Sequence, residues 1–295
     1  MMTLNRTLAC WLTIVALAGA AWSPTLASPA ASAIADARVA DISRALDERR
    51  LVDAGRMLDQ ALLAGVQDAR LDLLTGELQL ARGRPADALE TFTRAGAAPS
   101  AHAAARQGAG LALSLLGKSD EARAALEEAV AADPHAGRAW NGLGAEHDRR
   151  REWAQAEAAY ERALATSADP APVYNNRGFS RLLQGRLDEA VADFVQALER
   201  KPDMDAARTN LRLAMAMRGE YDRAVSGATP AEAAALLNNA GFAAAVRGDY
   251  RQADTLLTQA IKARGEYYQR ASANLQYARD LAAGDQRRPT ANADR

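Results

Sequence analysis

The side chains best suited to acid–base or metal chemistry are three histidines, His102, His135 and His147. None lies in an H-E-x-x-H pattern, and the only cysteine, Cys10, sits in an apolar run near the N-terminus, so we predict no metal site. The G-x-G-x-x-G, Walker and G-x-S-x-G motifs of nucleotide-binding and nucleophilic enzymes are also absent from the sequence. Acidic pairs such as Glu127-Glu128 are interpreted as solvated helix surface. We therefore expect a non-catalytic protein without a cofactor.

Asparagine is the residue type whose placement indicates binding. A side-chain amide donates and accepts hydrogen bonds at once, so a row of amides matches the peptide groups of an extended partner. Neighbouring aromatic and aliphatic side chains would hold the partner's apolar residues. The candidate binding residues are Asn141, Asn175, Asn176, Phe179, Asn210, Leu213, Asn238, Asn239 and Phe242.

A repeated unit must position these residues, because the sequence is self-similar at a period of 34 residues. A first column is alanine, at Ala88, Ala122, Ala156 and Ala190. A large apolar residue follows four positions later, at Phe92, Leu126, Tyr160 and Phe194. Glycine holds another column, at Gly76, Gly110, Gly144 and Gly178. Four-fold recurrence in register indicates a repeat architecture.

Each period predicts two helices joined by a turn. Trp140, Leu143, Gly144 and His147 fall on one face of a first helix. A glycine such as Gly185 then follows that helix, where a left-handed C-cap is expected, and Arg151 replaces this glycine in one unit. β-branched and aromatic residues are sparse, with aromatics only 5% of the chain, which disfavours a sheet.

These columns resemble the tetratricopeptide repeat over residues 35 to about 268. The resemblance implies an all-α, right-handed superhelical solenoid of helix–turn–helix units with a concave groove. The expected units are 35–68, 69–102, 103–136, 137–170, 171–204, 205–233 and 234–268. We expect a capping helix over 269–283 and a disordered tail over 284–295.

The resemblance also implies that positions 2, 5, 6, 9, 12 and 13 of each first helix line the groove, where the candidate residues named above fall. Two alternatives stay open. The asparagines at position 6 could simply bond neighbouring backbone, and Phe179 and Phe242 could belong to the core between units. A carboxylate-binding clamp would need cations on the same face, and Arg138 is the one clear candidate.

Unit 205–233 departs from the pattern. Arg212 occupies the glycine column, and Ser226-Gly227-Ala228-Thr229-Pro230 interrupts the second helix. We interpret this unit as shortened but packed. The alternative is a bend near 226–231, which proteolysis confined to Gly227-Ala228 would support.

The N-terminus predicts export. Arg6 precedes an apolar run, Thr7 to Trp22, and small residues follow it, which is the layout of a signal peptide over 1–27 with a linker over 28–34. Cleavage after Ala33 and retention as an anchor are alternatives. Cys10 lies inside the apolar run without a leucine three residues earlier, so we do not expect lipid anchoring.

The formal net charge of −1 and the absence of long basic runs argue against nucleic-acid binding. Segments 208–216, 236–242 and 270–275 resemble the TadD family of tight-adherence (Flp) pilus assembly proteins. That resemblance implies a periplasmic assembly factor that binds a secretin or another pilus component and meets the membrane only through partners. The alternative function is a generic periplasmic scaffold or chaperone for another envelope complex.

Overall fold

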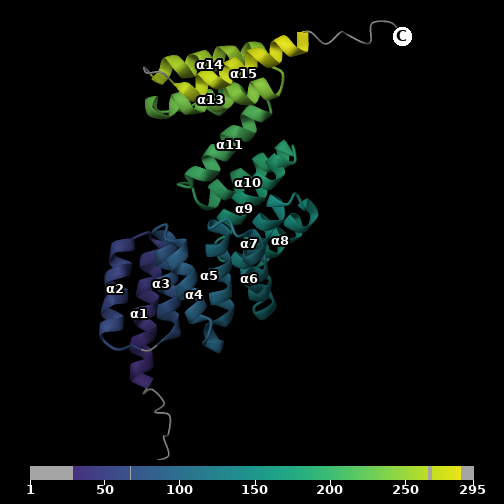
Figure 1. The fold of residues 1–295 in the computed structure, drawn as a ribbon. Helices are drawn as coiled ribbons and strands as arrows, with labels where there is room; N and C mark the ends of the chain where they lie inside the picture. The colour runs from purple at the N-terminus through teal and green to yellow at the C-terminus, as the bar shows by residue number, and fades with distance from the viewer. Residues whose placement is uncertain (1–28, 67, 265–267, 287–295) are drawn as a thin grey trace, which may run out of the picture.

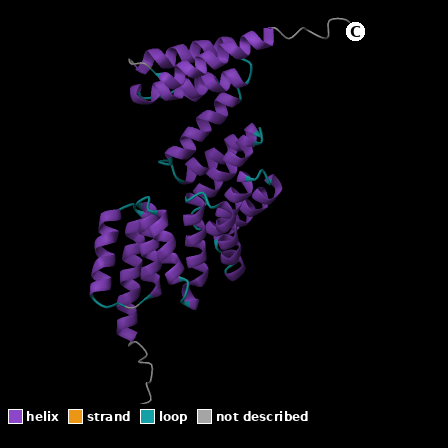
Figure 2. Cartoon of the chain, viewed as in Figure 1, coloured by secondary structure: helices purple, strands orange, loops and turns teal. Residues whose placement is uncertain are grey.

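The computed structural model describes residues 29–66, 68–264 and 268–286, and within them it contains helices and no strand (Figure 2). The all-α prediction is confirmed. Its α-helices are α1 (Pro29–Asp47), α2 (Leu51–Leu63), α3 (Ala69–Ala81), α4 (Pro85–Ala95), α5 (His102–Leu115), α6 (Ser119–Ala132), α7 (Gly137–Arg149), α8 (Trp153–Thr166), α9 (Ala171–Leu183), α10 (Leu187–Arg200), α11 (Asp205–Met217), α12 (Tyr221–Val225), α13 (Pro230–Val246), α14 (Tyr250–Arg264) and α15 (Gln269–Gln286). The expected signal peptide, with Cys10, lies outside the described residues.

Consecutive helices pair and the pairs stack, which produces the predicted solenoid. Figure 1 shows α11 lying between the α9–α10 pair and the group formed by α13, α14 and α15. No helix in the described part of the chain is long and apolar enough to cross a membrane.

The glycine column lets the two helices of a unit approach closely. A Cβ added at Gly144 would lie 2.5 Å from the ring of Tyr160, and one added at Gly178 would lie 2.9 Å from the ring of Phe194. Both rings are almost completely buried. The aromatic side chain of the second helix therefore fills the space that the glycine leaves.

The turn after each first helix takes the left-handed conformation that the sequence predicted. Gly185 has φ of +76°, and Arg151, which replaces the glycine, has φ of +59°. Arg49 adopts the same conformation one period before Gly83, with φ of +58°. Non-glycine residues tolerate this region poorly, so the turn geometry is imposed by the packing of the repeat.

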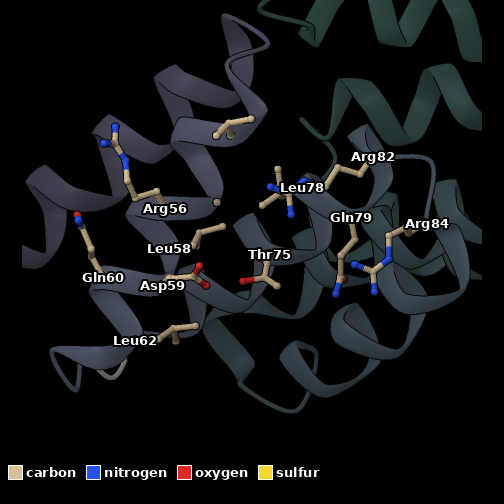
Figure 3. A pocket seen from close by; sticks show the side chains of 12 residues that line it. Arg56, Leu58, Asp59, Gln60, Leu62, Thr75, Leu78, Gln79, Arg82 and Arg84 are labelled. Carbon is tan, nitrogen blue, oxygen red and sulfur yellow. The ribbon is translucent and has the colours of Figure 1, made fainter.

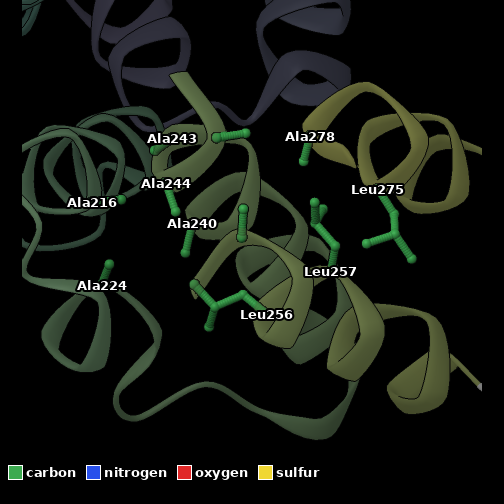
Figure 4. Packing of buried hydrophobic residues seen from close by; sticks show 11 residues of the cluster. Ala216, Ala224, Ala240, Ala243, Ala244, Leu256, Leu257, Leu275 and Ala278 are labelled. Atoms are coloured by element: carbon green, nitrogen blue, oxygen red, sulfur yellow. The ribbon is translucent and has the colours of Figure 1, made fainter. Parts of the chain in front are cut away.

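Unit 205–233 is built differently from its neighbours. Its second helix, α12, has only five residues, and α13 begins at Pro230 behind a capping box formed by Thr229 and Glu232. Ala216 and Ala224 of this unit share a core with Ala240 and Leu257 of the next (Figure 4). The short unit therefore packs directly on α13 and shares a core to which α14 also contributes.

Two helix boundaries differ from those expected. Helix α1 begins at Pro29, so residues 29–34 of the expected linker are helical; proline suits the first helical turn and the alanines after it favour a helix. Helix α15 continues to Gln286, past the expected end at 283, so Gly284, Asp285 and Gln286 of the expected tail are helical. The rest of the expected tail lies outside the described residues.

Candidate partner-binding groove

The predicted asparagines contact one another across neighbouring first helices. Asn176 Nδ2 donates to Asn141 Oδ1 at 3.2 Å, which joins α9 to α7. Asn210 Nδ2 donates to Asn175 Oδ1 at 3.0 Å, which joins α11 to α9, and Asn175 Nδ2 lies 3.2 Å from Asn176 Oδ1. These amides form one hydrogen-bonded chain across three units. Part of their hydrogen-bonding capacity is therefore used within the protein.

A second chain of amides lies at the C-terminal end of the array. Asn274 Nδ2 on α15 donates to Asn238 Oδ1 at 2.9 Å, and Asn238 Nδ2 donates to Asn239 Oδ1 at 3.3 Å. Within the described residues, no hydrogen bond links Asn210 to Asn239. The interruption falls at the short unit, in which Thr209 stands at the position of the accepting asparagines Asn175 and Asn238.

Apolar side chains beside both chains of amides are exposed to solvent. On α9, Phe179 is 41% exposed and Leu183 is 55% exposed. On α13, Phe242 is 40% exposed and stacks on Tyr277 of α15 with ring centroids 6.1 Å apart. Leu213, on α11, is half-buried. The exposure of Phe179 and Phe242 argues against the alternative that they fill the core between units.

A hollow of about 410 Å³ brings four of the predicted residues together. Asn175, Asn176, Phe179 and Asn210 line it. The remaining lining residues are Ala145, Asp148, Arg149, Tyr160 and Leu183. Asp148 and Arg149 were not among the candidates, although they hold positions 12 and 13 of unit 137–170. We name this hollow the α7–α11 pocket.

The carboxylate of Asp148 is held by hydroxyl groups in this pocket. Its Oδ1 accepts from Ser180 Oγ at 2.6 Å and its Oδ2 accepts from Tyr160 OH at 2.7 Å. Burial raises the pKa of Asp148 above its ordinary value, and the two hydroxyl donors only partly offset this. The arrangement leaves a partly desolvated negative charge at the pocket.

A network of ion pairs holds α8, α9 and α10 together. Arg177 donates to both carboxylate oxygens of Asp193, at 3.0 and 2.7 Å, and Arg181 Nη1 donates to Asp193 Oδ2 at 2.9 Å. Arg181 Nη2 also donates to Glu157 Oε1 at 2.5 Å. Asp193 is only 3% exposed. Burial opposes the charge on Glu157, but the hydrogen bond from Arg181 and the nearby guanidinium charges lower its pKa overall.

The candidate clamp residue Arg138 already has a carboxylate partner. Its Nη1 and Nη2 donate to Glu77 Oε1 and Oε2 at 2.8 and 3.0 Å. Because Glu77 lies on α3 and Arg138 on α7, this bidentate pair spans the intervening helix α5. The guanidinium of Arg138 is therefore not free to bind a partner's carboxylate, which disfavours the clamp.

Two of the three predicted histidines, His147 and His102, have structural side-chain contacts. The Nδ1 atom of His147 lies 2.6 Å from Glu152 Oε2, and that of His102 lies 3.2 Å from the carbonyl oxygen of Gly96. No group of three or more histidine, cysteine, aspartate or glutamate side chains in the described part of the chain could hold a metal ion.

A second hollow, of about 450 Å³, lies between α2 and α3 (Figure 3). Arg56 and Arg82 lie at its sides, and Leu58 and Leu78 form apolar parts of its wall. The Arg82 guanidinium donates to the carbonyl oxygen of Leu51 at 2.9 Å. None of the predicted binding residues lines this hollow.

Comparisons with known proteins agree with the repeat architecture. Family models of the tetratricopeptide repeat match residues 39–102, 108–172 and 171–204, together more than half of the chain. No relative is found among curated proteins.

Three solved structures illustrate the likeness, all below 25% identity, so they bear on the fold alone. PilW, described as a widely conserved type IV pilus biogenesis factor, has a TM-score of 0.57 at 18% identity, over 71% of this chain and 99% of that one. A thermophilic tetratricopeptide repeat protein of Thermus thermophilus has a TM-score of 0.54 at 22% identity, over 61% and 98%. A chain of the APC/C hetero-tetramer Cut9–Hcn1 has a TM-score of 0.63 at 16% identity, over 80% of this chain and 48% of that one, so this chain spans about half of its length.

The helix pairs, the glycine–aromatic packing and the family models lead to one conclusion: this chain belongs to the tetratricopeptide repeat family.

Proposed function

We propose that this chain is a non-catalytic, exported scaffold that binds a protein partner through its concave groove and assists assembly of a tight-adherence (Flp) pilus. The composition of the α7–α11 pocket is the observation that supports partner binding. There, exposed Phe179 and Leu183 stand beside the amides of Asn175, Asn176 and Asn210. Exposed apolar side chains next to polar groups are typical of surfaces that bind proteins.

Two observations support the pilus assignment. The segments between residues 208 and 275 resemble the TadD family, and PilW, a type IV pilus biogenesis factor, shares the fold. The apolar run Thr7 to Trp22 supports export to the periplasm. A secretin or another pilus component is the expected partner.

The test is an affinity capture from detergent-solubilised envelope of the source bacterium, with the full chain tagged at its C-terminus. The wild type should retain a secretin or pilus component, identified by mass spectrometry. A Phe179→Ala/Leu183→Ala variant should lose it, because the variant removes the exposed apolar surface of the pocket. The matched control, Leu63→Ala/Val195→Ala, removes two exposed apolar side chains elsewhere and should retain it.

Capture of components of a different envelope complex, lost in the same pocket variant, would replace the pilus assignment with a generic periplasmic scaffold. Equal capture by the wild type and both variants would contradict binding in this groove.

A further inference from the structure

Asp148 differs from the other buried and half-buried carboxylates around it. Glu146 accepts from Arg149 at 2.6 Å, Glu152 from His147 at 2.6 Å, and Asp193 from Arg177 at 2.7 Å. Asp148 accepts only from the hydroxyls of Ser180 and Tyr160, and within the described residues no ion pair reaches it.

The hydroxyl contacts leave Asp148 with unused acceptor capacity. An ionised carboxylate has about four lone-pair sites, and the structure fills two of them. Asp148 also lines the α7–α11 pocket, so a group that enters the pocket can reach it. A cationic donor would supply the missing charge and relieve the cost of desolvating this carboxylate.

The rest of the pocket suits the stem of a long basic side chain. Phe179, Leu183 and Ala145 present apolar surface, and Asn175, Asn176 and Asn210 present amides. Lysine and arginine bury their methylene stems along apolar surface and keep their charged heads at polar groups. Arg149 is the one cation among the described residues that line the pocket, and it donates to Glu146, so it has a carboxylate partner of its own.

We propose that the α7–α11 pocket binds a lysine or arginine side chain of the partner, with its stem against Phe179 and Leu183 and its cationic head on Asp148. This inference rests on the proposed function and adds the chemistry of the partner: a segment with a basic residue at the point where it crosses α9. An acidic or purely apolar segment would leave the Asp148 charge unpaired.

The probe is a pair of capped pentapeptides, Gly-Ala-Lys-Ala-Gly and the same peptide with norleucine in place of lysine. Binding to the full chain is followed by NMR, through the side-chain amide signals of Asn175, Asn176 and Asn210. Norleucine keeps the apolar stem and removes the charge. The lysine peptide should bind about tenfold more tightly, the usual worth of a hydrogen bond to a charged group.

Asp148→Asn preserves the shape of the side chain and removes its charge, so it should abolish the preference for lysine. The control, Asp203→Asn, removes a carboxylate charge from an exposed turn between α10 and α11. This control should keep the preference for lysine. No shift with the lysine peptide, equal affinity for the two peptides, or a preference that persists in Asp148→Asn would each overturn the proposal.

The same variants separate this inference from the proposed function. If Phe179→Ala/Leu183→Ala loses the captured partner while the wild type shows no preference for lysine, the groove is retained and the basic-residue assignment fails. If the preference for lysine depends on Asp148 but every variant captures the partner equally, the assignment of the pocket stands and the groove is not where that partner binds.

Discussion

The units formed by α7–α10 and the region formed by α11–α15 use the same repeat with different interiors. In α7–α10, Gly144 and Gly178 of the first helices each face a large aromatic ring of the second helix, and ion pairs join α9 to α8 and to α10. In α11–α15, alanines and leucines dominate the shared core (Figure 4). There, α15 is linked to α14 by the exposed ion pair Arg279–Asp254.

The difference shows what the glycine column requires. In the regular units the large residue lies 16 positions after the glycine, as Tyr160 follows Gly144 and Phe194 follows Gly178. The corresponding partner of Arg212 would be Ala228, which lies beyond the end of α12 at Val225. A glycine is therefore needed only where the second helix is long enough to present a bulky side chain to it.

The largest expected effect comes from removing one of the buried rings. Phe194→Ala should lower the free energy of unfolding by about 3–5 kcal/mol, because it leaves a cavity against Gly178. Urea denaturation measures the loss, and hydrogen exchange locates it. Exchange should accelerate in α9 and α10 and stay unchanged in α13–α15. Equal acceleration in both regions would show that they unfold as one unit, against the expected difference between them.

The ion network should be the next most sensitive feature of α7–α10. Asp193→Asn leaves Arg177 and Arg181 without their shared buried carboxylate and should cost about 3 kcal/mol. The counterpart in the other region is Asp254→Asn, which breaks an exposed pair and should cost less than about 1 kcal/mol. Similar losses in the two variants would mean that burial of the pair is unimportant here.

A smaller effect is expected from filling the glycine column. Gly144→Ala places a methyl group against the ring of Tyr160 and should destabilise the protein by about 1–3 kcal/mol. In α15, Gly284 has nothing within 4 Å, so Gly284→Ala should be neutral or stabilise by up to about 1 kcal/mol. Thermal unfolding of both variants measures the contrast, and a stabilising Gly144→Ala would refute the close-packing argument.

The smallest effect concerns acid sensitivity. The folded pKa of Glu157 lies below its ordinary value of 4.5, so its contribution to stability is present above pH 4.5 and is lost as the pH falls through the folded pKa. Glu157→Gln should therefore be less stable than the wild type at pH 7, by less than about 1 kcal/mol after solvent screening. Denaturation at several pH values should show the two proteins converging in acid; a difference that persists there would contradict this role.

The repeat itself could be predicted from the sequence because its signals are local and periodic. Gly178 and Phe194 share one unit, and Gly185 marks the turn between them, so a single period contains the information that builds the pair of helices. The short unit was also visible, since Ser226 to Pro230 interrupts a helix by composition alone.

The partners of charged side chains could not be predicted in the same way. Arg181 contacts Asp193 and Glu157, which lie 12 and 24 residues away, and these separations are not multiples of the repeat. Arg138 and Glu77 meet across two periods. Asp148 was accessible to prediction, because the positional rule that selected Asn141 also selects it in the same unit.

The Glu77–Arg138 pair has a mechanical consequence. A repeat solenoid can extend like a spring, because its pitch is set by contacts between successive units. The bond between α3 and α7 spans two units and stiffens the part of the array between them. We expect tension applied to the two ends to extend the array first at α11–α13, where the hydrogen-bonded amides are interrupted, and to extend α3–α7 later. Optical-tweezer unfolding of Glu77→Gln, compared with the wild type, tests this order. In the variant, α3–α7 should no longer extend later than α11–α13.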